Sequence, residues 1–149
     1  MTELPVILFP GSFDPFTIGH KSLADRALPL CGRLIIAIGH NPSKPGAESI
    51  GERIEAIRHI YRDEPRVEVT AYTGLTVDAC REHGATWMLR GVRTVADFEY
   101  ERNLADINRE LSGIDTLILF TLPGLASVSS SMVRELASHG RDVSRFIPS

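Results

Sequence analysis

Residues 6–20 combine an apolar run with side chains suited to binding phosphate. Residues 6–9 are Val-Ile-Leu-Phe, a run typical of a buried strand, and the Pro10-Gly11 pair predicts its end. Leucines and alanines at helical spacing predict a helix that begins near Gly19 and His20. His20 would then lie where a loop meets a helix N-terminus, whose free N–H groups and dipole favour negative charge. An imidazole in that position suits a phosphate site, although the stretch has neither a P-loop nor a Gly-x-Gly-x-x-Gly pattern.

Three further groups of residues could act on phosphates. Arg90 and Arg93 flank a glycine where a strand is expected to end, and two guanidinium groups can bind phosphate in bidentate fashion. Lys44 lies in a loop over residues 39–46 that is rich in Pro, Gly, Ser and Asn. Ser129–Ser131 precede a helix and offer hydroxyl and N–H groups as well as a cap. Each group alone is as typical of a solvated loop or a helix cap, so its significance depends on what the fold brings together.

The elements that must position these residues alternate between strand and helix five times. Apolar runs predict strands over residues 5–9, 34–38, 67–71, 86–89 and 116–121. Helical spacing predicts helices over residues 20–30, 76–83, 95–111 and 130–138, and Ser49 and Glu52 form a capping box that opens one more. Two of these helices have marked apolar faces: Ile54, Ile57 and Tyr61 on one, and Tyr100, Leu104, Ile107 and Leu111 on the other.

This alternation predicts an α/β fold with a Rossmann-like, doubly wound, five-stranded parallel sheet in the order 3-2-1-4-5 and helices on both faces. No repeat or linker interrupts the pattern, so residues 1–149 are expected to form a single domain. The switch point of such a sheet lies between the first and fourth strands, and ligands bind there beyond the strand carboxyl ends. The strand order would therefore bring Ser12 and His20 next to Arg90 and Arg93.

Bulk composition excludes several classes of protein. The chain has 149 residues, of which 43% are hydrophobic, and a net charge of −3, which gives no sign of a nucleic-acid-binding protein. Cys31 and Cys80 are interpreted as small buried side chains of a reducing compartment rather than a disulfide or metal site. The other histidines have no metal-cage spacing, and no apolar run suits a membrane span or a signal peptide. A soluble cytoplasmic protein without nucleic-acid or membrane partners is expected.

The phosphate-binding stretch resembles a family signature. Pro10–Pro15 (Pro-Gly-Ser-Phe-Asp-Pro), followed by Thr17-Ile18-Gly19-His20, is similar to the (His/Thr)-x-Gly-His signature of a nucleotidyltransferase superfamily, and the Thr in its first position resembles the phosphopantetheine adenylyltransferase family. Residues 90–101, Arg-Gly-Val-Arg-Thr-Val-Ala-Asp-Phe-Glu-Tyr-Glu, closely resemble the same family. So do residues 41–44 and residues 128–134. Phe9, where many relatives have Tyr, and Ser12, where Thr is commoner, depart from the pattern.

The resemblance implies roles for individual residues. The catalytic residues would be His20, which contacts the α-phosphate in the transition state, together with Lys44 and Arg93. The acceptor substrate would be bound by Ser12, Lys44, Thr76 and Arg90. ATP would be bound by Ser12, Phe13, His20, Gly91, Val92, Arg93, Glu101, Leu125, Ala126, Ser127, Val128, Ser129, Ser130 and Ser131.

The resemblance also implies a reaction, a cofactor and an assembly. The reaction would be adenylyl transfer from ATP to 4′-phosphopantetheine, giving dephospho-coenzyme A and pyrophosphate, with Mg²⁺ bridging ATP oxygens and no metal cage in the protein. A homohexamer is expected by resemblance alone. Two alternatives remain at this point: a related enzyme that uses nicotinamide mononucleotide or a polyol phosphate, and a nucleotide sensor that has lost turnover. Thr17 and residues 90–101 argue against the first, and the retained His20, Lys44, Arg90 and Arg93 argue against the second.

Overall fold

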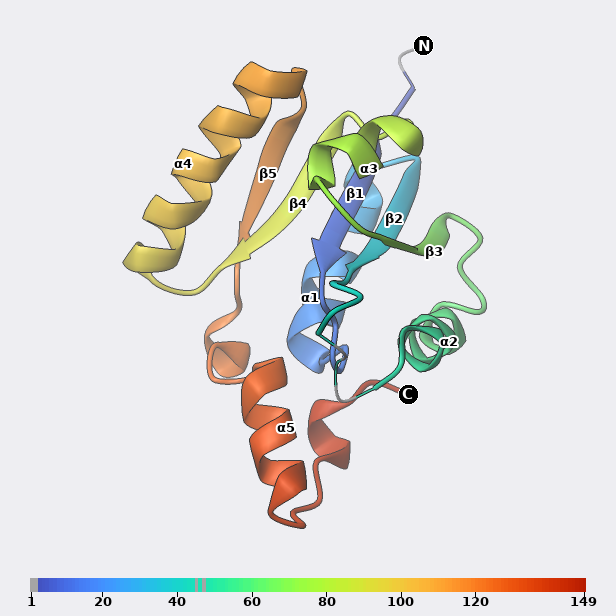
Figure 1. Cartoon of the computed structure of the whole chain (residues 1–149), viewed down its shortest axis with the longest axis vertical. Coiled ribbons are helices and arrows are strands. Elements are labelled where there is room, and N and C mark those ends of the chain that lie inside the picture. The colour runs from blue at the N-terminus through green and yellow to red at the C-terminus, as the bar shows by residue number, and fades with distance from the viewer. Residues whose placement is uncertain (1–2, 45, 47) are drawn as a thin grey trace.

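A computed structural model of the chain describes residues 3–44, 46 and 48–149, and its centre is a parallel five-stranded sheet in the order β3-β2-β1-β4-β5 (Figure 1). The expected strand order is therefore confirmed. The strands are β1 (Val6–Gly11), β2 (Arg33–Gly39), β3 (Val67–Tyr72), β4 (Trp87–Val92) and β5 (Asp115–Phe120). The α-helices are α1 (Ile18–Ala27), α2 (Ile50–Ile60), α3 (Thr76–Glu82), α4 (Val95–Ser112) and α5 (Ser130–Ser138). Short 3₁₀ turns lie at Leu28–Leu30, Pro123–Leu125 and Ser144–Phe146.

The central strands are buried on both faces because their alternating side chains enter two separate apolar clusters. Ile7 and Phe9 of β1 point to the side of α1 and α2, where they pack with Leu23 and Ile57. Leu8, between them, points to the opposite side and packs with Cys80 of α3. Helices therefore cover both faces of the sheet, as expected. Cys31 and Cys80 are both buried and free.

The crevice of the molecule forms where β1 and β4 separate. These two strands pair only at Ile7 with Trp87 and at Leu8 with Met88, whereas β1 pairs with β2 as far as Gly11. The prediction that Pro10 and Gly11 end the first strand is therefore wrong: past Leu8 only β2 pairs with β1, so the ladder tolerates a proline that lacks an N–H. The split between the central strands is the switch point at which a ligand site is expected.

The fourth strand is also longer than its apolar run predicts. It continues from Leu89 to Val92 because Arg90, Gly91 and Val92 pair with residues of β5. The prediction that this strand ends at Leu89, with the segment from Arg90 to Arg93 beyond it, is therefore wrong for all but Arg93. Extended backbone holds Arg90 at the wall of the crevice.

Helix α1 begins at Ile18, two residues before the predicted start, and its last turn is 3₁₀ rather than α. Thr17 is the N-cap and forms a reciprocal capping box with His20, the third residue of the helix. The capping box was not recognised in the sequence because its third helical residue is a histidine in place of the usual Glu or Gln. His20 is therefore part of the first turn and not of the preceding loop.

Helix α4 leaves three of the four residues of its predicted apolar face exposed, while Leu104 is half-buried. Tyr100, Ile107 and Leu111 are 65%, 54% and 65% exposed, while Glu101 on the neighbouring side is buried. Within residues 3–44, 46 and 48–149, no helix is long and apolar enough to span a membrane.

Candidate active site

The crevice between β1 and β4 opens into a cavity of about 530 Å³, here called the first cavity. Strand β1 and the loop after it form one wall, β4 and the start of α4 form another, and the N-terminus of α5 closes the end. Its lining includes most of the residues predicted to bind ATP: Ser12, Phe13, His20, Gly91, Arg93, Glu101, Val128, Ser129, Ser130 and Ser131. The fold therefore brings together segments that are more than a hundred residues apart in sequence.

His20 is held in one tautomer. The backbone N–H of Thr17 donates to Nδ1 of His20 over 2.9 Å, so Nδ1 is an acceptor and the ring proton is on Nε2. The ring packs among the rings of Phe13 and Phe16, with centroid distances of 5.0 and 5.5 Å. This burial, with a smaller contribution from the positive charge of Arg93, lowers the pKa of His20 to about 4. At neutral pH His20 is an uncharged hydrogen-bond donor that lines the first cavity.

The side chain of Arg90 forms an ion pair with the carboxylate of Glu101. Its Nε and Nη2 donate to the two oxygens of Glu101 over 2.9 and 2.7 Å, a bidentate pair. Glu101 is the buried partner and Arg90 is half-buried at the cavity lining. The pair joins β4 to α4 and fixes the guanidinium plane beside the cavity.

The far end of the first cavity is the N-terminus of α5. Ser129 caps the helix by accepting the N–H of Met132 over 3.1 Å. Arg134, one turn further along, lines the cavity and donates to the hydroxyl of Ser131 over 3.3 Å. Arg93 approaches from β4 and donates to the carbonyl of Ala126 over 3.4 Å. Free N–H groups, hydroxyls and two guanidinium groups make this end suitable for a polyphosphate.

Lys44 does not line the first cavity but a second one of about 350 Å³. The other residues lining this second cavity include His40, Asn41, Asp14 and Arg53. Ser12 and Arg134 line both cavities and form the boundary between them. His20 and Lys44 therefore line two adjoining cavities.

Five predicted site residues lie outside both linings among the residues the structure describes. Thr76 is at the start of α3 with its hydroxyl 2.8 Å from that of Tyr72, and Val92 is buried in β4. The other three precede α5: Leu125, Ala126 and Ser127. Their roles stay predictions.

The predicted site residues leave out four residues that line the two cavities: Thr17, Asp14, Arg53 and Arg134. Two of them had a signal in the sequence. Arg53 precedes Ile57 by four residues and so lies on the buried side of α2, an unusual place for a charge. Arg134 is the last residue of the stretch 128–134, which resembles the family. Asp14 and Thr17 lie within the family signature, but the signature gave neither of them a role of its own.

The described residues contain no cluster of His, Cys, Asp or Glu that could hold a metal ion. The first cavity is lined by two carboxylates, Asp97 and Glu101, and Arg90 already binds Glu101. This donor set suits a cation carried by phosphate oxygens and water better than one held by the protein.

Comparison with known proteins identifies the family. The cytidylyltransferase-like family matches residues 8–136. A phosphopantetheine adenylyltransferase from Bacteroides fragilis is 51% identical over 141 residues, which cover 95% of this chain and 94% of the relative. One from Porphyromonas gingivalis is 52% identical over 143 residues, which cover 96% and 94%. The chain belongs to the phosphopantetheine adenylyltransferase family. The resemblance of residues 10–20 and 90–101 is therefore confirmed, and so is the class of enzyme, a nucleotidyltransferase.

Solved structures agree on the fold. A bifunctional NMN adenylyltransferase/ADP ribose pyrophosphatase from Francisella tularensis aligns with a TM-score of 0.74 at 16% identity, over 98% of this chain and 45% of the neighbour. The same enzyme complexed with AMP and a manganese ion aligns with a TM-score of 0.72. At this identity the likeness concerns the Rossmann-like architecture alone.

Proposed function

We propose that this chain transfers the adenylyl group of ATP to the phosphate of 4′-phosphopantetheine, releasing pyrophosphate and dephospho-coenzyme A. The observation that carries the proposal is the pair of cavities that meet at Ser12 and Arg134. The first cavity has the histidine and the helix N-terminus suited to ATP, and the second has the lysine suited to an acceptor phosphate. Family membership supports the identity of the acceptor.

The reaction needs alignment and charge stabilisation rather than acid–base catalysis. An oxygen of the acceptor phosphate, already anionic near neutral pH, forms a bond to the α-phosphorus, and the bond from that phosphorus to the bridging oxygen of pyrophosphate breaks. No proton has to move and no covalent enzyme intermediate is needed. Bringing two anions together in line is the main barrier, which the cationic and N–H groups of the site reduce.

Each group of the site has a part in this step. His20 donates from Nε2 to an α-phosphate oxygen as negative charge builds there. Arg93 and the serines at the start of α5 hold the polyphosphate of ATP. Lys44 and Arg90 hold the acceptor phosphate from the two sides of Ser12, and binding of that phosphate competes with Glu101 for the Arg90 guanidinium.

Mg²⁺ enters in this proposal as part of the ATP substrate. It neutralises charge on the polyphosphate and assists departure of pyrophosphate. The absence of an acidic cluster among the described residues is compatible with a cation bound by phosphate oxygens and water.

We further infer that residues 1–149 act as one domain in a cytoplasmic homo-oligomer, a hexamer, in coenzyme A biosynthesis. The exposed apolar face of α4 supports an assembly, because a monomer would leave it in water. The number of subunits rests on the family resemblance.

Pyrophosphate release with ATP and Mg²⁺ tests the reaction, with 4′-phosphopantetheine, nicotinamide mononucleotide and glycerol 3-phosphate compared as acceptors. We expect release with 4′-phosphopantetheine alone. Release only with another acceptor would keep the chemistry of His20 but overturn the assigned acceptor. ATP binding without release for any acceptor would point to a nucleotide sensor.

A further inference from the structure

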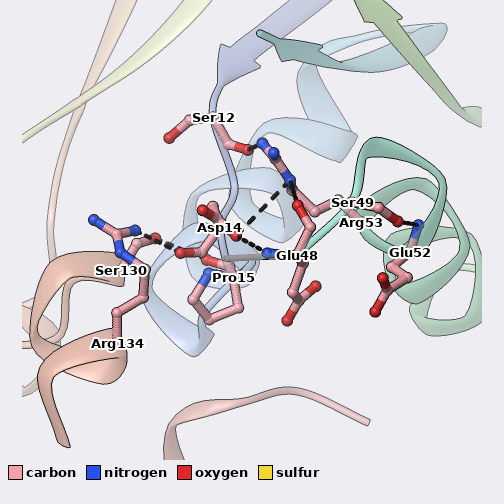
Figure 2. Close-up of polar contacts among 9 residues, drawn as sticks. All are labelled: Ser12, Asp14, Pro15, Glu48, Ser49, Glu52, Arg53, Ser130 and Arg134. Carbon is pink, nitrogen blue, oxygen red and sulfur yellow. Dashed lines mark hydrogen bonds and ion pairs between the residues drawn. The ribbon is translucent and has the colours of Figure 1, made fainter. Parts of the chain in front are cut away.

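The loop that follows β1 is held from two sides. Figure 2 shows α2 and the segment before it on one side, where Arg53 Nη1 donates to the carbonyl of Ser12 over 2.9 Å and the Glu48 N–H donates to Asp14 Oδ1 over 2.9 Å. Helix α5 holds the other side, with the Ser130 hydroxyl bonded to the carbonyl of Pro15 over 2.7 Å. The boundary between the two cavities is therefore fixed by elements from both halves of the chain.

Arg53 and Asp14 form a buried ion pair at the floor of the second cavity. Their exposed fractions are 5% and 6%, and Arg53 Nε lies 3.8 Å from Asp14 Oδ1. The same Nε donates to the carbonyl of Glu48 over 3.0 Å. Burying such a pair costs desolvation, so an apolar pair of equal volume would often serve stability at least as well. A pair with this much burial beside a ligand cavity calls for a reason other than stability.

Arg53 and Asp14 hold the backbone on both sides of Phe13, a residue in an unfavourable conformation. Phe13 has φ +46°, a left-handed conformation that is costly for a bulky side chain and is kept only where neighbours hold it. Arg53 holds the residue before it and Asp14 is the residue after it. The ring of Phe13 packs edge-on against His20 at 5.0 Å. The arginine is therefore linked to the histidine through Ser12 and Phe13.

The loop that carries Lys44 also rests on the pair. A Cβ at Gly46 would lie 2.5 Å from Arg53 Nη2 and 2.5 Å from Asp14 Oδ2, so only glycine lets the backbone approach this closely. The Glu48 N–H and carbonyl, two residues further on, bind the same two side chains. The ion pair therefore lies against Gly46 and is hydrogen-bonded to the backbone of Glu48, two described residues that follow Lys44 in the sequence.

We propose that Arg53, through its ion pair with Asp14, is a positioning residue for the second cavity, where the acceptor would bind. It fixes the Ser12 carbonyl relative to Gly46 and Glu48, and so sets where the acceptor phosphate meets the α-phosphate. The inference rests on the proposed function for the identity of the acceptor. It does not depend on that function for the contacts themselves.

Two variants test the proposal in the chain of residues 1–149. Arg53→Lys keeps the charge but cannot reach both carbonyls, and Gly46→Ala keeps both charges but displaces the loop from them. We expect each to raise KM for 4′-phosphopantetheine about tenfold and lower kcat, with KM for ATP changed less than about twofold. A general loss of folding would lower the active fraction without changing the ratio of the two KM values.

Matched controls come from the same helix. Arg58→Lys makes the same replacement on the exposed side of α2, and Gly51→Ala adds a methyl group with nothing within 4 Å of it. Neither should change either KM by more than about twofold. Equal changes in the two KM values for Arg53→Lys, or unchanged kinetics for both test variants, would overturn the proposal.

Hydrogen exchange separates failure of this inference from failure of the proposed function. The Glu48 amide is bonded to Asp14 Oδ1, so its exchange should speed up about tenfold or more in Arg53→Lys and Gly46→Ala. This readout needs no turnover and applies even if the wild-type enzyme uses another acceptor. Unchanged exchange at Glu48 would show that the ion pair does not hold the loop.

Discussion

At the scale of single residues, His20 is set up as a neutral donor. Thr17 occupies Nδ1, burial lowers the pKa of His20 to about 4, and Nε2–H is left for the cavity. A neutral donor fits a reaction in which no proton has to be transferred. In the proposed reaction its contribution would be largest when charge on the α-phosphate is greatest, that is, in the transition state.

His20→Ala should therefore lower kcat by about 10²- to 10³-fold, the usual loss for one donor of this kind. The dissociation constant for ATP should change less than about fivefold, measured by calorimetry beside steady-state kinetics. His59→Ala, at an exposed position on α2, is the control and should leave both quantities unchanged. A parallel loss of turnover and ATP affinity would show that His20 acts in ground-state binding.

The same histidine should make the fold sensitive to acid. Its pKa is about 4 when folded and 6.5 ordinarily, so between these values the unfolded chain binds a proton that the folded chain does not. The free energy of unfolding should fall as pH drops from 6.5 to 4, by at most about 3 kcal/mol from this group.

His20→Gln provides the comparison for this pH dependence, because Thr-x-x-Gln is itself a capping box and glutamine does not titrate. Urea unfolding at several pH values should give a shallower slope for this variant. An equal slope in the two proteins would mean that other groups cause the acid sensitivity.

At the scale of elements, the sequence predicted the order of the strands but not their ends. Hydrophobic runs end at Phe9 and Leu89, yet β1 and β4 continue because pairing with β2 and β5 continues. Strand pairing is a tertiary property that a local pattern does not contain. The site was predictable where a motif is local, as at Ser129–Ser131. The role of Arg53 depends on a contact with Ser12, 41 residues away in the sequence, so the sequence alone could not assign Arg53 to the site.

The N-terminus of α5 is capped by Ser129 and is proposed to bind the ATP polyphosphate, and these two roles can be tested separately. Ser129→Ala should cost about 1 kcal/mol of stability because the cap to Met132 is lost. Ser129→Asp keeps a good cap but puts a carboxylate where phosphates would bind, so stability should hold while ATP affinity falls about tenfold or more.

Thermal unfolding and ATP titration of both Ser129 variants give the two quantities. Ser49→Asp, at the corresponding cap of α2 and outside the first cavity, is the control and should bind ATP normally. Unchanged ATP affinity in Ser129→Asp would limit this helix start to a structural role.

At the scale of the whole molecule, α4 carries an apolar surface that the single chain leaves exposed. Its inward side is marked by the buried Glu101 and by half-buried small or polar residues at helical spacing: Ala105, Asn108 and Ser112. Three of its apolar residues, Tyr100, Ile107 and Leu111, lie about a quarter turn away and are exposed, and Phe120 at the end of the edge strand β5 is 68% exposed. Apolar residues grouped in this way are typical of an interface between subunits.

The protein should therefore have a mass in solution of at least twice the 16.4 kDa of one chain, measured by light scattering or sedimentation. Ile107→Asp combined with Leu111→Asp should shift it toward the monomer, because two charges would be buried without partners. The monomer fold should survive, since both side chains are more than half exposed in the single chain. Arg102→Asp, exposed on another side of α4, should leave the mass unchanged. A wild-type monomer, or an assembly unaffected by the double variant, would mean that this face of α4 is not the interface.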